Sequence, residues 1–235
     1  MPPSPSLSLP EELLLLGLDP QRGNARVRMR YVEYGVAGAV LAELELGGHV
    51  TEERGRIQVI NPLAPADPVA AQVLASLPAP GKGQRGKGER TKGWVRSAGR
   101  HVTELYLNRL VEQGALRRET RRFLGLFPYH RHPAGPEDVS AAVWQRLAAS
   151  IHAGSPAGRD RALAALLSAT DLANRYFPGF AARATRSTLR HLTREHWPTD
   201  AVHRAVKQDK AAANSGNSGG DGNGGGDGGG GGGGG

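Results

Sequence analysis

The sequence SLPEELLLLGL, from Ser8 to Leu18, predicts the helix around which the rest of the fold is built. Ser8 and Glu11 have the spacing of a capping box, in which each side chain binds the backbone N–H of the other residue. Pro10 falls in the first turn, where no helical hydrogen bond is lost. Five leucines between positions 13 and 18 then cover most of the circumference. A helix that is apolar nearly all round is buried, so we expect other helices to surround this one.

The composition favours a cytoplasmic protein with a polyanionic partner. The net charge of +8 suits either a lipid headgroup or a nucleic acid. The chain contains no cysteine, which excludes disulfides and thiolate chemistry. Leu13–Leu16 is too short to span a bilayer and follows two glutamates, unlike a secretory signal. We therefore expect a cytoplasmic protein that is peripheral on the cytoplasmic face of a membrane.

Composition and hydrophobic periodicity also predict the domain organisation. Residues 1–7 are rich in Pro and Ser and are expected to be disordered, as is the Gly-rich tail at 208–235. Between them we expect a single helical domain over residues 8–207. Helical spacing occurs at 36–46, 69–77, 94–111, 137–152, 159–174, 180–194 and 199–207, with hairpin signals at 49–60 and 115–129. The predicted fold class is mostly α: a helical bundle around a buried N-terminal helix, with one or two short β-hairpins.

No residue pattern in the chain predicts catalysis. The Gly-x-Ser-x-Gly motif of serine hydrolases is absent. His130 and His132 have no third metal ligand near them in the sequence. Residues 81–88 resemble a phosphate-binding loop but lack its hydroxyl residue and the preceding strand, and are interpreted as a basic linker. We therefore expect a protein that is not an enzyme, with no catalytic residues, no metal and no cofactor.

Positive charge is concentrated in residues 81–131, which contain 13 basic and 4 acidic residues. Arg96 and Arg100 lie one turn apart on the long predicted helix and share a face. The second hairpin places arginines directly before an apolar sequence. This arrangement is typical of a membrane interface, although a half-buried core strand with a solvated basic loop gives the same pattern. The predicted membrane-contacting residues of this hairpin are Arg121, Arg122, Phe123, Leu124, Leu126 and Phe127.

Several stretches in the same order resemble the Golgi phosphoprotein 3 family. Besides the first helix, they are YGVAGAVLAEL at 34–44, LVEQGAL at 110–116, the sequence at 123–133, and the helix at 160–174. The resemblance covers about residues 7–193 and implies a mostly helical protein that binds phosphatidylinositol 4-phosphate at membrane surfaces. It also implies an adaptor role toward membrane-protein clients. The content of Arg, Ala and Gly favours a bacterial, actinobacterial-type member.

The resemblance further implies which residues bind the headgroup. The tryptophan of the family's pocket falls near Arg28, and one of the pocket's basic residues falls at Ala37. Two arginines of the family's long helix fall at Arg100 and Thr103, so Arg100 is retained. With Arg96 beside it, the predicted lipid-headgroup site consists of Arg28, Arg96 and Arg100. A homo-oligomer formed through the hairpin is a further expectation.

A nucleic-acid-binding protein is the alternative. Helix followed by hairpin, at 36–60 and again at 94–129, resembles two winged-helix units, and the charge has the right sign. Such a protein would place Arg96, Arg100 and Arg109 in or beside a groove. Nucleic acid is the less favoured partner, after a surface of anionic phospholipid or phosphoinositide.

Overall fold

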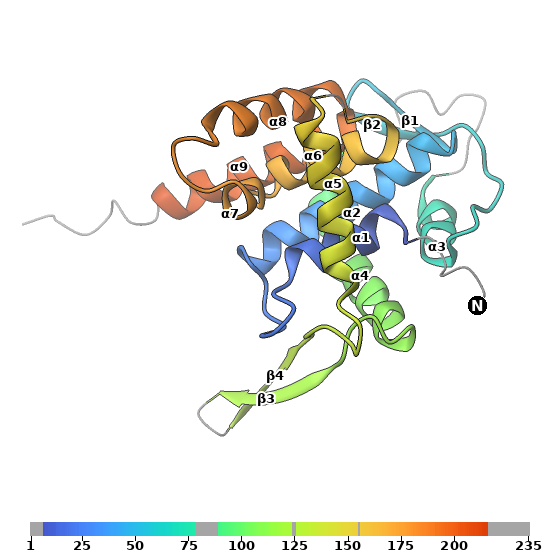
Figure 1. The fold of residues 1–235 in the computed structure, drawn as a ribbon. Coiled ribbons are helices and arrows are strands. Elements are labelled where there is room, and N and C mark those ends of the chain that lie inside the picture. The colour runs from blue at the N-terminus through green and yellow to red at the C-terminus, as the bar shows by residue number, and fades with distance from the viewer. Residues whose placement is uncertain (1–6, 79–88, 124–125, 155, 216–235) are drawn as a thin grey trace, which may run out of the picture.

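Residues 7–78, 89–123, 126–154 and 156–215 are described by the computed structural model, which is mostly α-helical (Figure 1). This confirms the predicted fold class. In Figure 1 the second of two short hairpins projects from the helical body. The elements in chain order are α1 (Leu9–Gly17), α2 (Met29–Leu46), β1 (Val50–Glu53), β2 (Arg56–Val59), α3 (Pro68–Ser76), α4 (Thr91–Glu112), β3 (Glu119–Phe123), β4 (Phe127–Arg131), α5 (Val139–His152), α6 (Gly158–Ala169), α7 (Ala173–Tyr176), α8 (Arg183–Glu195) and α9 (Trp197–Ser215).

Helix α1 is the centre of the bundle, as predicted. All nine of its residues are buried, and it packs against α2, α4, α5 and α6. Ser8 and Glu11 form the capping box: the Ser8 N–H donates to the Glu11 carboxylate at 2.7 Å. Burying each leucine stabilises the fold by roughly 1.5–3 kcal/mol. The sequence pattern of this one helix therefore determines where the core lies.

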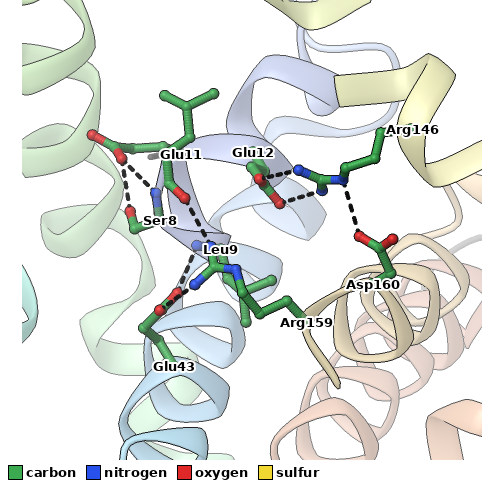
Figure 2. A network of polar contacts seen from close by, with 9 residues as sticks. Ser8, Leu9, Glu11, Glu12, Glu43, Arg146, Arg159 and Asp160 are labelled. Carbon is green, nitrogen blue, oxygen red and sulfur yellow. Dashed lines mark hydrogen bonds and ion pairs between the residues drawn. The ribbon is translucent and has the colours of Figure 1, made fainter. Parts of the chain in front are cut away.

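The buried carboxylate of Glu12 ties α1 to α5 and α6 (Figure 2). Arg146 of α5 donates to both Glu12 oxygens, with distances of 2.8 and 2.9 Å. The Nε of the same arginine donates to Asp160 of α6 at 3.1 Å. Bidentate arginine–carboxylate pairs fix geometry as well as charge. This pair therefore sets the orientation of α5 against the central helix.

A second carboxylate, that of Glu43 in α2, holds the beginning of α1 (Figure 2). It accepts the N–H of Leu9 at 2.7 Å and pairs with Arg159 of α6 at 2.5 Å. The same arginine donates to the carbonyl oxygen of Leu7 at 2.8 Å. The first N–H groups of a helix have no hydrogen-bond partner within the helix. Glu43 supplies the partner for the N–H of Leu9, and Arg159 supplies one for the carbonyl oxygen of Leu7, so neither group is left without a hydrogen bond.

A third polar cluster connects α1 with α3 and α4 through Arg109. Its Nε lies 3.2 Å from Glu11 Oε1, and its Nη1 lies 2.5 Å from Asp67 Oδ1. Tyr106 donates to the other oxygen of Asp67 at 2.7 Å, and Asp67 also caps α3. Glu11 is only 1% exposed. Arg109 is thus the counterion of two largely buried carboxylates.

The largest differences from the predicted helices are three. Helix α2 begins at Met29 rather than at position 36, because Tyr31, Val32 and Tyr34 are buried and extend its apolar face. The helix predicted at 159–174 is divided into α6 and α7, because Asp171 has a φ of 69° in the left-handed region.

The last helix is the third difference, and it changes the predicted tail. α9 runs to Ser215, so residues 208–215 are helical and not part of a disordered tail. Its buried residues continue the helical period through Val202, Ala205 and Val206. Residues 1–6, the linker at 81–88 and the tail from 216 lie outside the described residues, and the division into one domain with two disordered ends stays a prediction.

Candidate functional site

A cleft of about 810 Å³ lies where α2, α4 and the base of the β3–β4 hairpin meet. Its lining is rich in basic and hydroxyl-bearing side chains. The lining residues are Met29, Arg30, Glu33 and Tyr34 from α2; Arg96, Arg100, Thr103, Glu104, Leu107 and Asn108 from α4; and Arg118, His130 and His132 from the hairpin and its flanks. The consecutive elements α4 and the hairpin, together with the distant helix α2, therefore contribute cations to one hollow.

The helical floor of this cleft depends on a close approach of α2 and α4 at Gly99. A Cβ atom at this position would lie 2.9 Å from the carbonyl oxygen of Glu33 and 3.1 Å from its carbonyl carbon. Both of those are backbone atoms, so they cannot move aside as a flexible side chain can. Glycine at 99 is therefore required for the backbones to come this close.

Besides α2 and α4, the β3–β4 hairpin lines the cleft, and its base is hydrogen-bonded to the turn between α1 and α2. The N–H of His132 donates to the carbonyl of Gly23 at 2.9 Å, and the N–H of Ala134 donates to that of Pro20 at 2.8 Å. Strands β3 and β4 pair antiparallel from Glu119 with Arg131 to Phe123 with Phe127. The base is therefore held in place while the strands project beyond the helices (Figure 1).

Asp209 of α9 pairs with two of the cleft arginines. Its carboxylate lies 3.3 Å from the Nε of Arg30 and 3.3 Å from Nη2 of Arg96. The hydroxyl of Tyr34 donates to the same carboxylate at 3.0 Å. Burial and this hydrogen bond raise the pKa of Tyr34, so the phenol stays protonated and acts as a donor. Two arginines and a tyrosine thus already form a binding site for a carboxylate.

Farther along α4, the other charges of the cleft are more open. Arg100 is 81% exposed and forms an i,i+4 pair with Glu104 at 3.2 Å. Burial raises the pKa of Glu33, and Arg100 and Arg30 act against that shift. Burial, followed by Arg118, lowers the pKa of His132, so this histidine is neutral at pH 7. The permanent positive charges of the cleft are those of its arginines.

Thr103 lines the cleft with a hydroxyl that has no hydrogen-bond partner among the described residues. The residue is 1% exposed. Buried hydroxyl groups are almost always hydrogen-bonded, to protein or to another molecule. The oxygen itself has almost no exposed surface, so the arginines and not this hydroxyl are the groups that the cleft offers to an occupant.

The sequence model of the Golgi phosphoprotein 3 (GPP34) family matches residues 9–208. The chain belongs to this family. No curated protein matches the chain. The matched range of the GPP34 model includes every element from α1 to α8 and most of α9, and therefore the whole cleft.

Within the described residues, no helix is both long and apolar enough to cross a bilayer. That part of the chain also has no group of three His, Asp or Glu side chains placed to hold a metal ion.

For this GPP34 protein, the structure brings together two of the three residues predicted to bind the headgroup. Arg96 and Arg100 both line the cleft. Arg28 does not: it lies just before α2, beside the ring of Tyr31, in a separate hollow that includes Asp171. The structure therefore does not bring Arg28 into this cleft, because it faces a different part of the surface from Arg30, two residues later. A role for Arg28 in headgroup binding stays a prediction.

The predicted hairpin residues lie on β3, on β4 and between them. Arg121 and Arg122 are exposed, and Arg121 pairs with Glu119 at 3.1 Å. Leu126 is 76% exposed. Leu124, together with the side chains of Phe123 and Phe127, lies outside the described part of the chain. At least one apolar side chain of this hairpin is thus displayed to solvent.

The predicted headgroup site did not include three residues that line the cleft, or Asp209, which pairs with two of its arginines. Arg30 was considered only as a further member of a basic patch, and Arg118 only as one of the arginines of the hairpin. Tyr34 was assigned no role in binding. Asp209 was assigned to the tail. A sequence signal did exist for Asp209, since it continues the spacing of Val202 and Ala205 along one helix face.

Proposed function

We propose that this GPP34-family protein binds the headgroups of anionic phospholipids in the cleft, with a phosphatidylinositol 4-phosphate-like lipid as the preferred class. It acts as a peripheral membrane-binding protein and adaptor for membrane proteins, not as an enzyme. The observation that carries the proposal is the convergence of four arginines, from α2, α4 and the hairpin flank, on one cleft. Arginine is the residue best suited to phosphate oxygens, because its guanidinium group binds them through two parallel hydrogen bonds.

The hairpin gives the cleft an orientation toward a bilayer. Its base forms a wall of the cleft, and it carries an exposed leucine beyond the helical body. A basic group near an anionic leaflet contributes about 1 kcal/mol, and a buried leucine contributes roughly 1.5–3 kcal/mol. These contributions are reduced by the entropy lost on association. We therefore expect reversible binding of micromolar affinity or weaker.

The alternative function, nucleic-acid binding, has less support from the geometry. Twelve of the residues of α2 are buried, which leaves this helix no face for a DNA groove. Arg109, the third arginine expected at a groove, pairs with Glu11 and Asp67 inside the fold.

Co-sedimentation with liposomes tests the proposal directly. Vesicles of phosphatidylcholine alone would be compared with vesicles that also contain phosphatidylserine or phosphatidylinositol 4-phosphate, beside a DNA mobility-shift assay at the same salt concentration. We expect binding to both anionic vesicles, strongest with the phosphoinositide, and little to neutral ones. Binding to DNA at a salt concentration where no vesicle is bound would overturn the proposal in favour of nucleic acid.

The cleft arginines and the exposed leucine of the hairpin are expected to differ in how their contributions to vesicle binding depend on salt. The double variant Arg96→Ala/Arg100→Ala should lose about tenfold or more in vesicle affinity at low salt and less at high salt, because charge interactions are screened over about 8 Å at physiological ionic strength. Leu126→Ser should weaken binding at all salt concentrations. The variant Arg54→Ala/Lys92→Ala removes two exposed charges outside the cleft and serves as the control. Equal losses in both double variants would mean that only net charge matters.

Asp209 competes with any phosphate for Arg30 and Arg96. The variant Asp209→Asn keeps the size of the side chain but removes its negative charge, so we expect it to bind anionic vesicles more tightly, by about threefold to tenfold at low salt. Titration of vesicles into protein measures the change. Weaker binding by this variant would show that the carboxylate supports the arginines instead of competing for them.

A further inference from the structure

Residues 172–194 contain five arginines and no acidic residue. They form α7, α8 and the turn between these helices, at a distance in the sequence from the basic segment that lines the cleft. Neighbouring positive charges without acidic residues among them repel one another. A partner of opposite charge that binds such a surface relieves this repulsion and is therefore favoured.

Helix α8 displays three of these arginines on one face. It packs on α6 and α9 through Leu189 and Leu192, which are buried. Arg183, Arg190 and Arg194 lie within about 40° of one another around the helix axis and are exposed. Within the described part of the chain, none of the three has a carboxylate within ion-pair distance, whereas Arg30, Arg96 and Arg100 of the cleft all do. This face of α8 therefore has uncompensated positive charge.

An aromatic side chain stands at the beginning of the same face. Phe180 is 82% exposed, and the guanidinium of Arg183 lies 5.9 Å from the centre of its ring. The turn that carries it is held in place by Arg186, which donates to the carbonyl oxygens of Phe177 and Gly179. An exposed phenylalanine on an anchored turn beside arginines is typical of a surface that meets lipid headgroups.

The α8 face and the hairpin point in opposite directions. Figure 1 shows α8 on one side of the helical body and the β3–β4 hairpin projecting from the other. The arginines lie on the side of α8 away from α6 and α9, and hence away from the core. A flat bilayer in contact with the hairpin therefore cannot reach α8 of the same molecule.

We propose that the outward face of α8, with Phe180, binds a second anionic phospholipid surface, so that one molecule holds two membranes together. The inference rests on the proposed function of the cleft, which supplies the first membrane contact. The face has positive charge and an exposed aromatic ring, spread along the outer side of one helix. It therefore suits an extended anionic surface better than a small anion.

Vesicle clustering separates this inference from headgroup binding. Phosphatidylserine-containing vesicles would be mixed with the full chain, with co-sedimentation measuring binding and dynamic light scattering measuring clustering. We expect the parent chain both to bind and to cluster them. Arg190→Ala/Arg194→Ala should still bind through the cleft but cluster vesicles about tenfold less, because it has lost two basic groups from the second surface. Phe180→Ser should also reduce vesicle clustering, whereas Arg54→Ala/Lys92→Ala should cluster vesicles as the parent chain does.

The outcomes are distinguishable. A parent chain that binds vesicles without clustering them overturns the inference and leaves headgroup binding intact, whereas a parent that binds no vesicle overturns both. Clustering that persists in Arg190→Ala/Arg194→Ala shows that the bridge is made elsewhere, for example by self-association. If the parent chain binds DNA in a mobility-shift assay and that variant does not, the α8 face binds nucleic acid and the lipid inference is wrong.

Discussion

Replacing Leu15 by aspartate is expected to abolish the native fold. Leu15 is 3% exposed at the centre of the bundle, where helix α1 has no solvent-facing side. The substitution removes about 2–3 kcal/mol of apolar burial and takes a charge out of water into the core, which costs several kcal/mol more. Together these effects are comparable with a total stability of about 5–15 kcal/mol. We expect an insoluble chain, or one that keeps far-UV circular dichroism but loses the cooperative thermal transition.

The same substitution at Leu126 provides the matched control. That leucine is 76% exposed on the hairpin, so Leu126→Asp should leave the melting temperature within a few degrees of the parent. A soluble Leu15→Asp variant that melts cooperatively near the parent temperature would contradict the central place of α1.

Arg109→Met is expected to cost about 3–5 kcal/mol in the free energy of unfolding, measured by urea denaturation. Methionine keeps most of the length of the side chain but leaves the carboxylates of Glu11 and Asp67 without their cation. Both carboxylates are largely buried, so neither can be solvated in place of the lost pair. The large effect comes from the uncompensated charges and not from the attraction itself.

A second substitution distinguishes these causes. Adding Glu11→Gln to Arg109→Met removes one of the unpaired charges, so the double variant should be more stable than Arg109→Met alone. Arg204→Met breaks a pair with Asp200 on the surface, where the arginine side chain is 68% exposed, and should cost less than about 1 kcal/mol. If the two arginine variants lose equal stability, burial of the Arg109 cluster is not the cause.

The elements that could be predicted are those whose signal is local. The capping box and the leucines of α1 lie within eleven residues, and both appear in the structure as expected. The division between α6 and α7 was not predicted. Asp171 takes a left-handed conformation there, and the sequence around it has no glycine or proline to indicate a break in the helix. The extension of α9 was obscured by the Gly-rich sequence that follows it.

The candidate site shows the same contrast. Arg96 and Arg100 were predicted to act together because a single helix places residues four apart on one face. Arg30 and Arg118 join them only through tertiary packing, which no periodicity within either segment reports. Arg28 lies outside the cleft for a related reason. A family correspondence by position does not determine which side of the chain a residue faces where a helix begins.

The contact between Gly99 and the backbone of Glu33 has a consequence for the kinetics of recognition. Two helices that meet backbone to backbone cannot close around a ligand or open to admit one, because any change in their separation breaks the packing of both. The floor of the cleft is then preorganised, and only side chains must rearrange when an anion arrives, including the pairs of Arg30 and Arg96 with Asp209. Association should therefore proceed without a conformational gate, at a rate governed by electrostatic steering and diffusion.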